Sequence, residues 1–586
     1  MNKILKKITK KEIIYIILSL ILIIVQVWLD LKMPDYMSEI TKLVQTEGSE
    51  ISDILLQGSY MLACATGSLL SACIVGFFAS YIATSISAKL REELFSQVEE
   101  FSMEEMNQFS VSSLITRTTN DVSQVEMLIA MGLQLMVKAP ITAIWAVLKI
   151  LDKNFTWSAI TGGAVLILLL TIAILMKLVF PNFKKVQTMI DNVNNVTREN
   201  LTGIRVVRAF NGEGYQENKF ENVNKELTRL QTFNQRAMSI MSPIMYMIMN
   251  GLTLAIYFAG AYMINEAELM NKIGIFSDMV VFSSYAMQVI MSFLMVAMIF
   301  MMVPRATVSI KRILEVLNSN ISIKDGKIKE GKKGENGTIE FKNVSFKYPD
   351  SQDYTLKNIS FKANKGDTVA IIGSTGSGKT TLINLIPRFF DTTDGEVLVD
   401  GINVKEYVQE NLHNKIGYVP QKAVLFNETI RNNVDYGENG KKLKTEEEIK
   451  EAIRVAQGTE FVEKMEGKYN AHIAQGGTNV SGGQKQRLSI ARAIARNPEI
   501  YIFDDSFSAL DYKTDYKLRK DLKEYTKDTT SIIVAQRIGT VMNADKILVL
   551  EDGECVGIGT HKELMKNCSV YQEIAYSQLS KEELES

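Results

Sequence analysis

Long apolar runs fill the first half of the chain, and short ones fill the second half. Six segments are apolar over about 20 residues or more, the length that crosses a hydrocarbon core of roughly 30 Å. They lie at residues 13–33, 55–82, 127–150, 157–180, 243–264 and 277–303. After about residue 337, short β-branched runs alternate with amphipathic segments. This pattern predicts an α-helical transmembrane domain of six helices fused to an α/β domain.

The polar segments between spans two and three and between spans four and five are too helical to be ordinary loops. From Ile54 to Phe101 there is no proline and only three glycines. About 45 helical residues would reach roughly 70 Å, so this helix must project well beyond the membrane. Gly203, Gly212 and Gly214 predict a turn at the far end of the second excursion, and the sequence SMEEMNQFSVSS predicts one at the end of the first.

The distribution of charge predicts the orientation of the chain. Five lysines precede the first span, and nine lysines and arginines lie between spans four and five, whereas the segment between spans one and two is acidic. By the positive-inside rule, both termini and the soluble domain are cytoplasmic in a multi-pass protein of the cell membrane. Abundant lysine, asparagine and isoleucine indicate a prokaryotic source. Cys64, Cys73, Cys555 and Cys568 lack metal-ligand or redox spacing and are predicted to be free thiols.

A nucleotide-binding motif opens the soluble domain. DTVAIIGSTGSGKTTLINLI reads as a strand, a glycine-rich loop and a helix, and it matches the pattern GxxxxGK[ST]. Backbone N–H groups of such a loop surround phosphates, the lysine reaches the β and γ phosphates, and the hydroxyl after it ligates Mg²⁺. The motif therefore predicts ATP and Mg²⁺ as ligands. The predicted loop residues are Gly373, Ser374, Thr375, Gly376, Ser377, Gly378, Lys379, Thr380 and Thr381.

An acidic strand end completes this predicted site. The apolar run EIYIFDD ends in Asp504, which is suited to hold Mg²⁺ directly or through water, and Asp505 follows it.

The segment VSGGQKQRLSIARAIARNP, residues 480–498, resembles the signature of ATP-binding cassette (ABC) proteins and stands just ahead of the acidic strand. With six spans ahead of one cassette, the chain resembles a half-transporter of the exporter type. The resemblance implies a transmembrane domain at 1–320, a linker at 321–337, a nucleotide-binding domain at 338–578 and a tail at 579–586. It also implies that two cassettes pair head to tail, so that each ATP meets the phosphate loop of one chain and the signature of the other.

Further roles follow from the resemblance at matching positions. Tyr348 corresponds to the aromatic residue that stacks on adenine, and Gln421 to a glutamine that touches Mg²⁺ and the membrane-domain contact. Asp511 lies in the loop that communicates between the two sites. The residues that would cap the γ phosphate of the opposite site are Ser481, Gly482, Gly483 and Gln484.

The sequence departs from the family in the catalytic pocket. Asp505 stands where the family usually has glutamate, so its carboxylate sits roughly 1.5 Å back from the attacking water. Misplacement on that scale can cost on the order of a hundredfold in rate. Gln536 replaces the family's switch histidine and cannot carry charge. Because the signature is intact, we expect a weakly hydrolytic chain paired with a different half-transporter, rather than a homodimer. Gln475, where exporters generally have glutamate, is a milder departure.

The last span indicates the cargo. Its methionines recur at helical spacing and would offer a pliable surface to apolar or amphipathic compounds, or would simply pack against helices and lipid. Lys138, within the third span, would either snorkel to the interface or line a cavity for anionic or zwitterionic cargo. The favoured function is multidrug export, with lipids as the surroundings and no nucleic acid as a partner. The alternatives are a lipid, peptide or siderophore exporter, or a nucleotide-gated membrane regulator. The methionines are Met287, Met291, Met295, Met298 and Met302.

Overall fold

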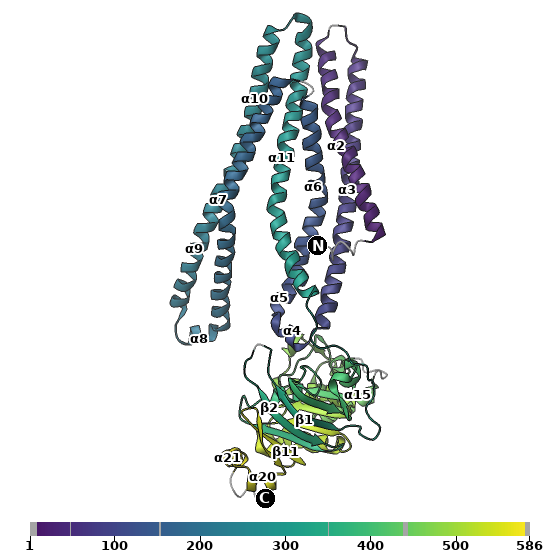
Figure 1. Ribbon diagram of the computed structural model, residues 1–586, viewed down its shortest axis with the longest axis vertical. Coiled ribbons are helices and arrows are strands. Elements are labelled where there is room, and N and C mark those ends of the chain that lie inside the picture. The colour runs from purple at the N-terminus through teal and green to yellow at the C-terminus, as the bar shows by residue number, and fades with distance from the viewer. Residues whose placement is uncertain (1–8, 47, 152–153, 350, 438–443, 580–586) are drawn as a thin grey trace. The chain divides into compact units, whose positions relative to one another are not determined.

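The computed structural model describes residues 9–46, 48–151, 154–349, 351–437 and 444–579. The chain divides into two compact units (Figure 1). The first unit comprises Met1–Glu99 and Val111–Ser319, and the second comprises Glu100–Ser110 and Asn320–Ser586. Of the predicted tail, only Leu579 lies within the described residues.

The first unit is helical. Within the described residues, six helical stretches are long and apolar enough to cross a membrane, which confirms the six predicted spans. The helices of this unit are α2 (Lys10–Gln45), α3 (Ile51–Glu99), α5 (Val111–Thr116), η1 (Arg117–Asp121), α6 (Val122–Leu151), α7 (Phe155–Thr202), α8 (Ile204–Ala209), α9 (Glu213–Ser239), α10 (Met241–Glu266) and α11 (Leu269–Leu317).

The two predicted excursions are present as continuous helices. Helix α3 runs for 49 residues without interruption. Helices α7 and α9 lie side by side with the short helix α8 at their end (Figure 1). Gly203 and Gly212 flank α8 as predicted, but Gly214 lies in the first turn of α9 and takes no part in the bend. The bend is complete at Gly212, so the chain is already helical at Gly214.

Ion pairs connect the membrane helices of this unit. Lys138 on α6 has an acidic partner, because its Nζ lies 3.0 Å from Asp30 Oδ2 on α2. Lys149 on α6 pairs in the same way with Asp35 on α2, at 3.0 Å. The Tyr285 hydroxyl of α11 donates to Asp35 Oδ1 at 2.6 Å. These acids pair with the two half-buried lysines, and sequence reasoning missed them because they lie more than a hundred positions away along the chain.

The second unit is an α/β domain with two larger sheets. One sheet has the order β2-β1-β4-β5, and the other has the order β12-β11-β3-β10-β9-β6. In the second sheet β11, β3, β10, β9 and β6 run parallel, and β12 is antiparallel. The strands are β1 (Ile339–Phe346), β2 (Leu356–Ala363), β3 (Thr368–Gly373), β4 (Asp394–Val399), β5 (Ile402–Asn403), β6 (Ile416–Val419), β7 (Glu428–Thr429), β8 (His472–Ile473), β9 (Ile500–Asp504), β10 (Thr530–Val534), β11 (Lys546–Glu551) and β12 (Glu554–Gly559).

Helices cover and connect these strands. The first one along the chain, α12, follows β3 directly, and α17 precedes β9. The helices are α12 (Lys379–Asn384), η2 (Val404–Glu406), α13 (Gln409–Asn414), α14 (Ile430–Val434), α15 (Glu446–Val455), α16 (Thr459–Lys464), η3 (Lys468–Asn470), η4 (Gln475–Gly477), α17 (Gly482–Arg496), α18 (Tyr512–Tyr525), α19 (Ile538–Val541), α20 (His561–Asn567) and α21 (Ser569–Gln578).

Two segments outside the sheets are fastened to the second unit. The short helix α4 (Met103–Gln108) carries Glu105, whose buried carboxylate accepts a hydrogen bond from the Ser322 backbone N–H at 3.0 Å. The segment predicted as a linker is also hydrogen-bonded: the N–H of Gly326 donates to the Tyr407 carbonyl, and the N–H of Lys327 donates to the Glu406 carbonyl, each at 2.8 Å. This part of the chain therefore packs against the backbone at Glu406 and Tyr407.

Candidate functional site

The predicted site residues follow the carboxyl ends of four parallel strands. The glycine-rich loop follows β3, Gln421 follows β6, Asp504 ends β9, and Gln536 follows β10. Parallel strands bring their carboxyl ends to one edge of the sheet, where ligands bind in open α/β folds. The strand order β3-β10-β9-β6 therefore explains why segments more than 150 residues apart meet in one pocket.

Glycines allow the loop after β3 to close tightly. Gly378 has a φ of +94°, and a Cβ there would lie 2.7 Å from the Leu356 side chain. Lys379 folds back over the loop, with its Nζ donating to the Gly373 carbonyl at 3.0 Å and to the Ser374 carbonyl at 2.6 Å. Burial lowers the pKa of this lysine, although Asp505 and Asp504 oppose that shift. The lysine ammonium group is thus held by backbone carbonyls of the loop.

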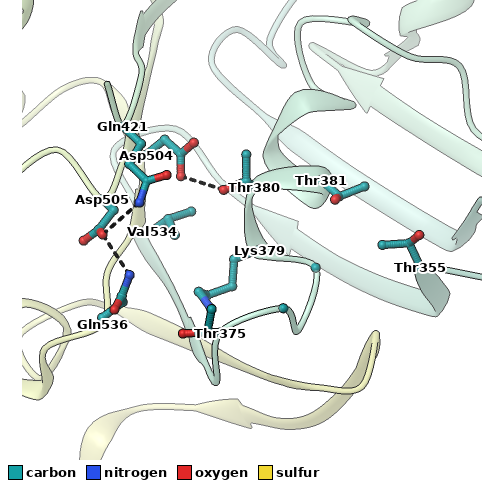
Figure 2. Close-up of a pocket in the computed structure, with 12 residues that line it drawn as sticks. Thr355, Thr375, Lys379, Thr380, Thr381, Gln421, Asp504, Asp505, Val534 and Gln536 are labelled. Carbon is teal, nitrogen blue, oxygen red and sulfur yellow. Dashed lines mark hydrogen bonds between the residues drawn. The ribbon is translucent and has the colours of Figure 1, made fainter. Parts of the chain in front are cut away.

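Thr380 and Asp504 form the second part of the pocket. The Thr380 hydroxyl donates to Asp504 Oδ1 at 3.0 Å (Figure 2). Burial raises the pKa of Asp504; the hydroxyl of Thr380 lowers it, and the neighbouring Asp505 raises it further. A hydroxyl and a carboxylate at this separation are hard oxygen donors of the kind that Mg²⁺ prefers.

Asp505 is held by two neutral amides. Its Oδ2 accepts from Gln536 Nε2 at 2.9 Å and from Gln421 Nε2 at 3.4 Å, as Figure 2 shows. The backbone at Asp505 is left-handed, with a φ of 44°. Burial raises the pKa of its carboxyl group, and the hydrogen bond from Gln421 lowers it. The sequence places Gln421 at Mg²⁺ and puts Asp505 and Gln536 in one pocket; the structure adds that both amides bind the same oxygen of Asp505.

The pocket as a whole fits a nucleoside triphosphate with Mg²⁺. Its cavity of about 230 Å³ is open to one side and has the lysine, the hydroxyl–carboxylate pair and the glycine cradle on its walls. A Cβ at Gly373 would lie 2.1 Å from the Leu550 carbonyl, so the loop has no room for a larger residue there. The lining residues are Thr355, Thr375, Gly376, Gly378, Lys379, Thr380, Thr381, Gln421, Asp504, Asp505, Val534 and Gln536.

Thr355 and Val534 are lining residues that sequence reasoning missed. Val534 is the last residue of β10, and Thr355 immediately precedes β2. Neither side chain belongs to a motif, so only their positions at strand ends could have pointed to them. Three residues predicted for the loop, Gly373, Ser374 and Ser377, do not line the cavity. Ser377 is buried, and Gly373 and Ser374 each contribute a carbonyl to Lys379.

Tyr348 is attached to this pocket through Thr381. Its hydroxyl lies 3.0 Å from Thr381 Oγ1, and its ring packs edge-on against Phe346 and Phe390. The ring is thus fixed beside the helix that follows the phosphate loop. Its stacking on adenine stays a prediction.

The signature segment lies outside this pocket, at the start of α17. Ser481 is the N-cap: its hydroxyl accepts from the Gln484 N–H at 3.3 Å, and Gln484 Oε1 accepts from the Ser481 N–H at 2.8 Å. This capping box leaves Ser481 and Gly482 exposed, while a Cβ on Gly483 would come within 3.3 Å of the Ala509 carbonyl. Asp511 likewise caps α18, accepting from the Thr514 N–H at 3.0 Å.

Comparisons with known proteins agree with this architecture. Residues 356–508 match the ABC transporter family, and residues 16–293 match the ABC transporter transmembrane region. An uncharacterized ABC transporter ATP-binding protein of Mycobacterium tuberculosis is 37% identical over 530 residues, covering 90% of each chain. The chain belongs to the ABC transporter family. Its transmembrane and ATP-binding parts are fused, as in exporters, and the family implies ATP hydrolysis coupled to transport by a multi-pass membrane protein.

Other relatives place this transporter among bacterial exporters. The uncharacterized ABC transporter ATP-binding protein YfiB of Bacillus subtilis is 35% identical, covering 92% of each chain. An ATP-dependent lipid A-core flippase of Haemophilus influenzae is 33% identical, covering 88% of this chain and 87% of the flippase. The structure of a bacterial Atm1-family ABC exporter with ATP bound superposes with a TM-score of 0.81 at 22% identity, covering 98% of this chain and all of that one. The last comparison establishes the fold.

Proposed function

We propose that this transporter exports hydrophobic or amphipathic compounds as the weakly hydrolytic half of a heterodimer. In this proposal residues 1–320 form the membrane domain, 321–337 the linker and 338–578 the ATP-binding domain. Lys379 and the loop around it hold the phosphates of ATP. Thr380, Gln421 and Asp504 hold Mg²⁺, which would neutralise phosphate charge when bound.

The observation that carries the proposal is the environment of Asp505. A water-polarising carboxylate needs reach, but this side chain is one methylene short. Its Oδ2 already accepts from Gln536 and Gln421. Both donors are neutral, so neither supplies the charge that a histidine at position 536 would carry. We infer that this pocket binds ATP and turns it over slowly.

The state of the signature favours a different chain as the partner. Ser481 and Gly482 are exposed at the N-terminus of α17, where backbone N–H groups suit an anion. A homodimer would combine two sound signatures with two weak pockets. In a heterodimer, the intact signature of this chain would complete a catalytically competent ATP pocket of the partner. We prefer the heterodimer for this reason.

The exposed faces of the membrane helices support an apolar or amphipathic cargo. Met291 and Met298 of α11 are 42% and 45% exposed, away from the buried face that carries Phe282 and Tyr285. A lipid is the second candidate cargo, because the Haemophilus influenzae relative is named as a lipid A-core flippase. Drug-stimulated ATPase of the purified pair would favour the first cargo, and stimulation by lipid alone would favour the second.

The decisive experiment compares two substitutions in the chain purified with its partner. Asp505→Ala should lower ATP turnover by less than about twofold, whereas Ser481→Ala should lower it by about a hundredfold or more, the range seen when a catalytic phosphate contact is lost. Asp528→Ala removes an exposed acid of the same domain and serves as the control. Because Ser481 also caps α17, thermal unfolding must show that its variant is folded. Equal losses from Asp505→Ala and Ser481→Ala would refute the asymmetric assignment.

A further inference from the structure

A cavity of about 420 Å³ lies between α3 and α6, apart from the ATP pocket. Its volume is within the range of small-molecule sites. Three of the residues that form it, Ser80, Met127 and Ala130, lie at the ends of the predicted spans 55–82 and 127–150. The others lie just beyond those ends, on the side where both helices continue into the cytoplasmic excursions. Given the predicted orientation, the cavity therefore opens at the boundary between the membrane and the cytoplasm.

One acid and one base face each other in this cavity. Arg91 Nη2 on α3 lies 3.1 Å from Glu126 Oε2 on α6, and the two side chains are 42% and 29% exposed. A pair this exposed contributes little to folding stability, so a ligand could replace either partner at low cost. The pair between Lys89 and Glu12 differs, because Glu12 is only 2% exposed and also accepts from Ser85. That second pair is a structural contact between helices.

The remaining walls combine hydroxyl groups with an apolar edge. Ser80 and Thr84 lie on α3, and Ser123 lies on α6, at spacings that place them on the faces turned to the cavity. Met127 adds an apolar side chain that is 49% exposed. Toward the membrane centre the helices approach closely, since a Cβ at Gly76 would lie 3.4 Å from Gln134 Nε2. The cavity is therefore lined by hydroxyl groups, and it ends toward the membrane centre, where α3 and α6 approach each other.

We propose that this cavity, defined by Ser80, Thr84, Arg91, Ser123, Glu126 and Met127, binds the zwitterionic headgroup of an amphiphile from the inner leaflet. The guanidinium of Arg91 suits a phosphate, the carboxylate of Glu126 suits an ammonium group, and the hydroxyls suit ester or glycerol oxygens. Met127 would contact the start of the tail. The inference rests on the proposed export of amphiphiles and narrows their class to those carrying both charges.

The test is photolabelling of the full-length transporter in nanodiscs. The probes share one diazirine-bearing tail and differ in headgroup: phosphatidylethanolamine, phosphatidylglycerol, and a quaternary ammonium lipid. Mass spectrometry should find label on the peptides spanning 80–91 and 123–130 about fivefold more often with phosphatidylethanolamine than with the other two, because only that headgroup meets both charges. Equal labelling by the three probes, or labelling elsewhere alone, would overturn the proposal.

Variants separate headgroup binding from structural support. Arg91→Gln and Glu126→Gln should each reduce the phosphatidylethanolamine label about fivefold. The preference should shift toward the quaternary ammonium lipid in Arg91→Gln and toward phosphatidylglycerol in Glu126→Gln, because each variant keeps one charge. The reversed pair Arg91→Glu with Glu126→Arg keeps both charges and should retain more label than either single variant. Lys42→Gln breaks an ion pair of similar exposure, with Glu39, and should change nothing. Loss of label in the reversed pair equal to that in the single variants would contradict headgroup binding.

Transport measurements distinguish this inference from the proposed function. If the cavity labels as expected but no amphiphile stimulates ATP turnover by the transporter with its partner, the binding site stands and the export proposal fails. If amphiphiles are exported but the label does not depend on the headgroup, export stands and the binding site is wrong.

Discussion

Lengthening the acid at position 505 tests the central argument directly. The substitution Asp505→Glu adds one methylene and moves the carboxylate forward by about 1.5 Å. In the structure Asp505 Oδ2 is held back by Gln536 at 2.9 Å and by Gln421 at 3.4 Å. Misplacement on that scale can cost about a hundredfold, equivalent to roughly 2.7 kcal/mol on the activation barrier. Because Gln536 remains in place, we expect the rate of ATP hydrolysis to rise by about tenfold. A gain of about a hundredfold is the most that restoring the reach of the carboxylate could give.

The backbone adds a stability cost to the same change. Asp505 has a φ of 44°, a conformation that short polar residues tolerate better than glutamate does. We therefore expect Asp505→Glu to lower the stability of the ATP-binding domain by about 1 kcal/mol while raising its activity. A faster and slightly less stable enzyme is a specific combination that a general improvement in folding would not produce.

The assay is steady-state ATP hydrolysis by the chain alone, in nanodiscs, at saturating ATP and Mg²⁺. Asp505→Asn keeps the length and removes the charge, so it should show no gain and serves as the matched control. Combining Asp505→Glu with Gln536→His should add to the rate. If neither Asp505→Glu nor the combined variant hydrolyses ATP faster than the natural chain, the reach of this carboxylate does not limit turnover.

Three further predictions concern other parts of the chain. Gly378→Ala should weaken ATP binding at least tenfold, measured by calorimetry, because φ is +94° and a Cβ would meet Leu356 at 2.7 Å. Burial lowers the pKa of His413 below its unfolded value, so the domain should lose stability as the pH falls below about 6.5; His413→Gln should reduce that loss in thermal melts at pH 7.5 and 5.5. Lys138→Met should destabilise the membrane unit by about 1–3 kcal/mol, and adding Asp30→Asn should recover most of it, by thermal unfolding in detergent.

Each of these has a control in the same chain. Gly539→Ala adds a Cβ with nothing within 4 Å and should leave ATP binding unchanged. If the melting temperature of His413→Gln falls between pH 7.5 and pH 5.5 by as much as that of the natural chain, then groups other than His413 cause the loss of stability in acid. Additive effects of the Lys138 and Asp30 substitutions would mean that the two side chains do not stabilise each other.

Local patterns predicted the parts of this molecule that depend on neighbouring residues. The six spans follow from runs of apolar residues, and the phosphate loop follows from glycines at fixed spacing before Lys379. The pairing of Lys138 with Asp30 could not be read in this way, because it depends on how two helices pack. Sequence comparison with the family identified Asp505 and Gln536 as substitutions. Only the fold brings the amide of one against the carboxylate of the other.

The segment read as a linker illustrates a different limit. Charged residues and glycines between domains are typical of flexible connections. Here the same residues pair their backbone with Tyr407 and Glu406, and Gly331 lies so close to Asp400 that a Cβ would stand 2.3 Å from that residue's Cβ. Composition describes what a segment can do when nothing is beside it. It does not show that the backbone around Glu406 and Tyr407 will be available to pair with it.

The hydrogen bond between Glu105 and Ser322 has a mechanical consequence. Helix α4 is covalently part of the stretch between α3 and α5, yet its buried acid fastens it to the start of the ATP-binding unit. A displacement of that unit therefore carries α4 with it as one body. The load then reaches the first unit at two places, the end of α3 and the beginning of α5, and not only through the chain at residue 320. Several points of attachment can apply a torque, whereas a single tether can only pull.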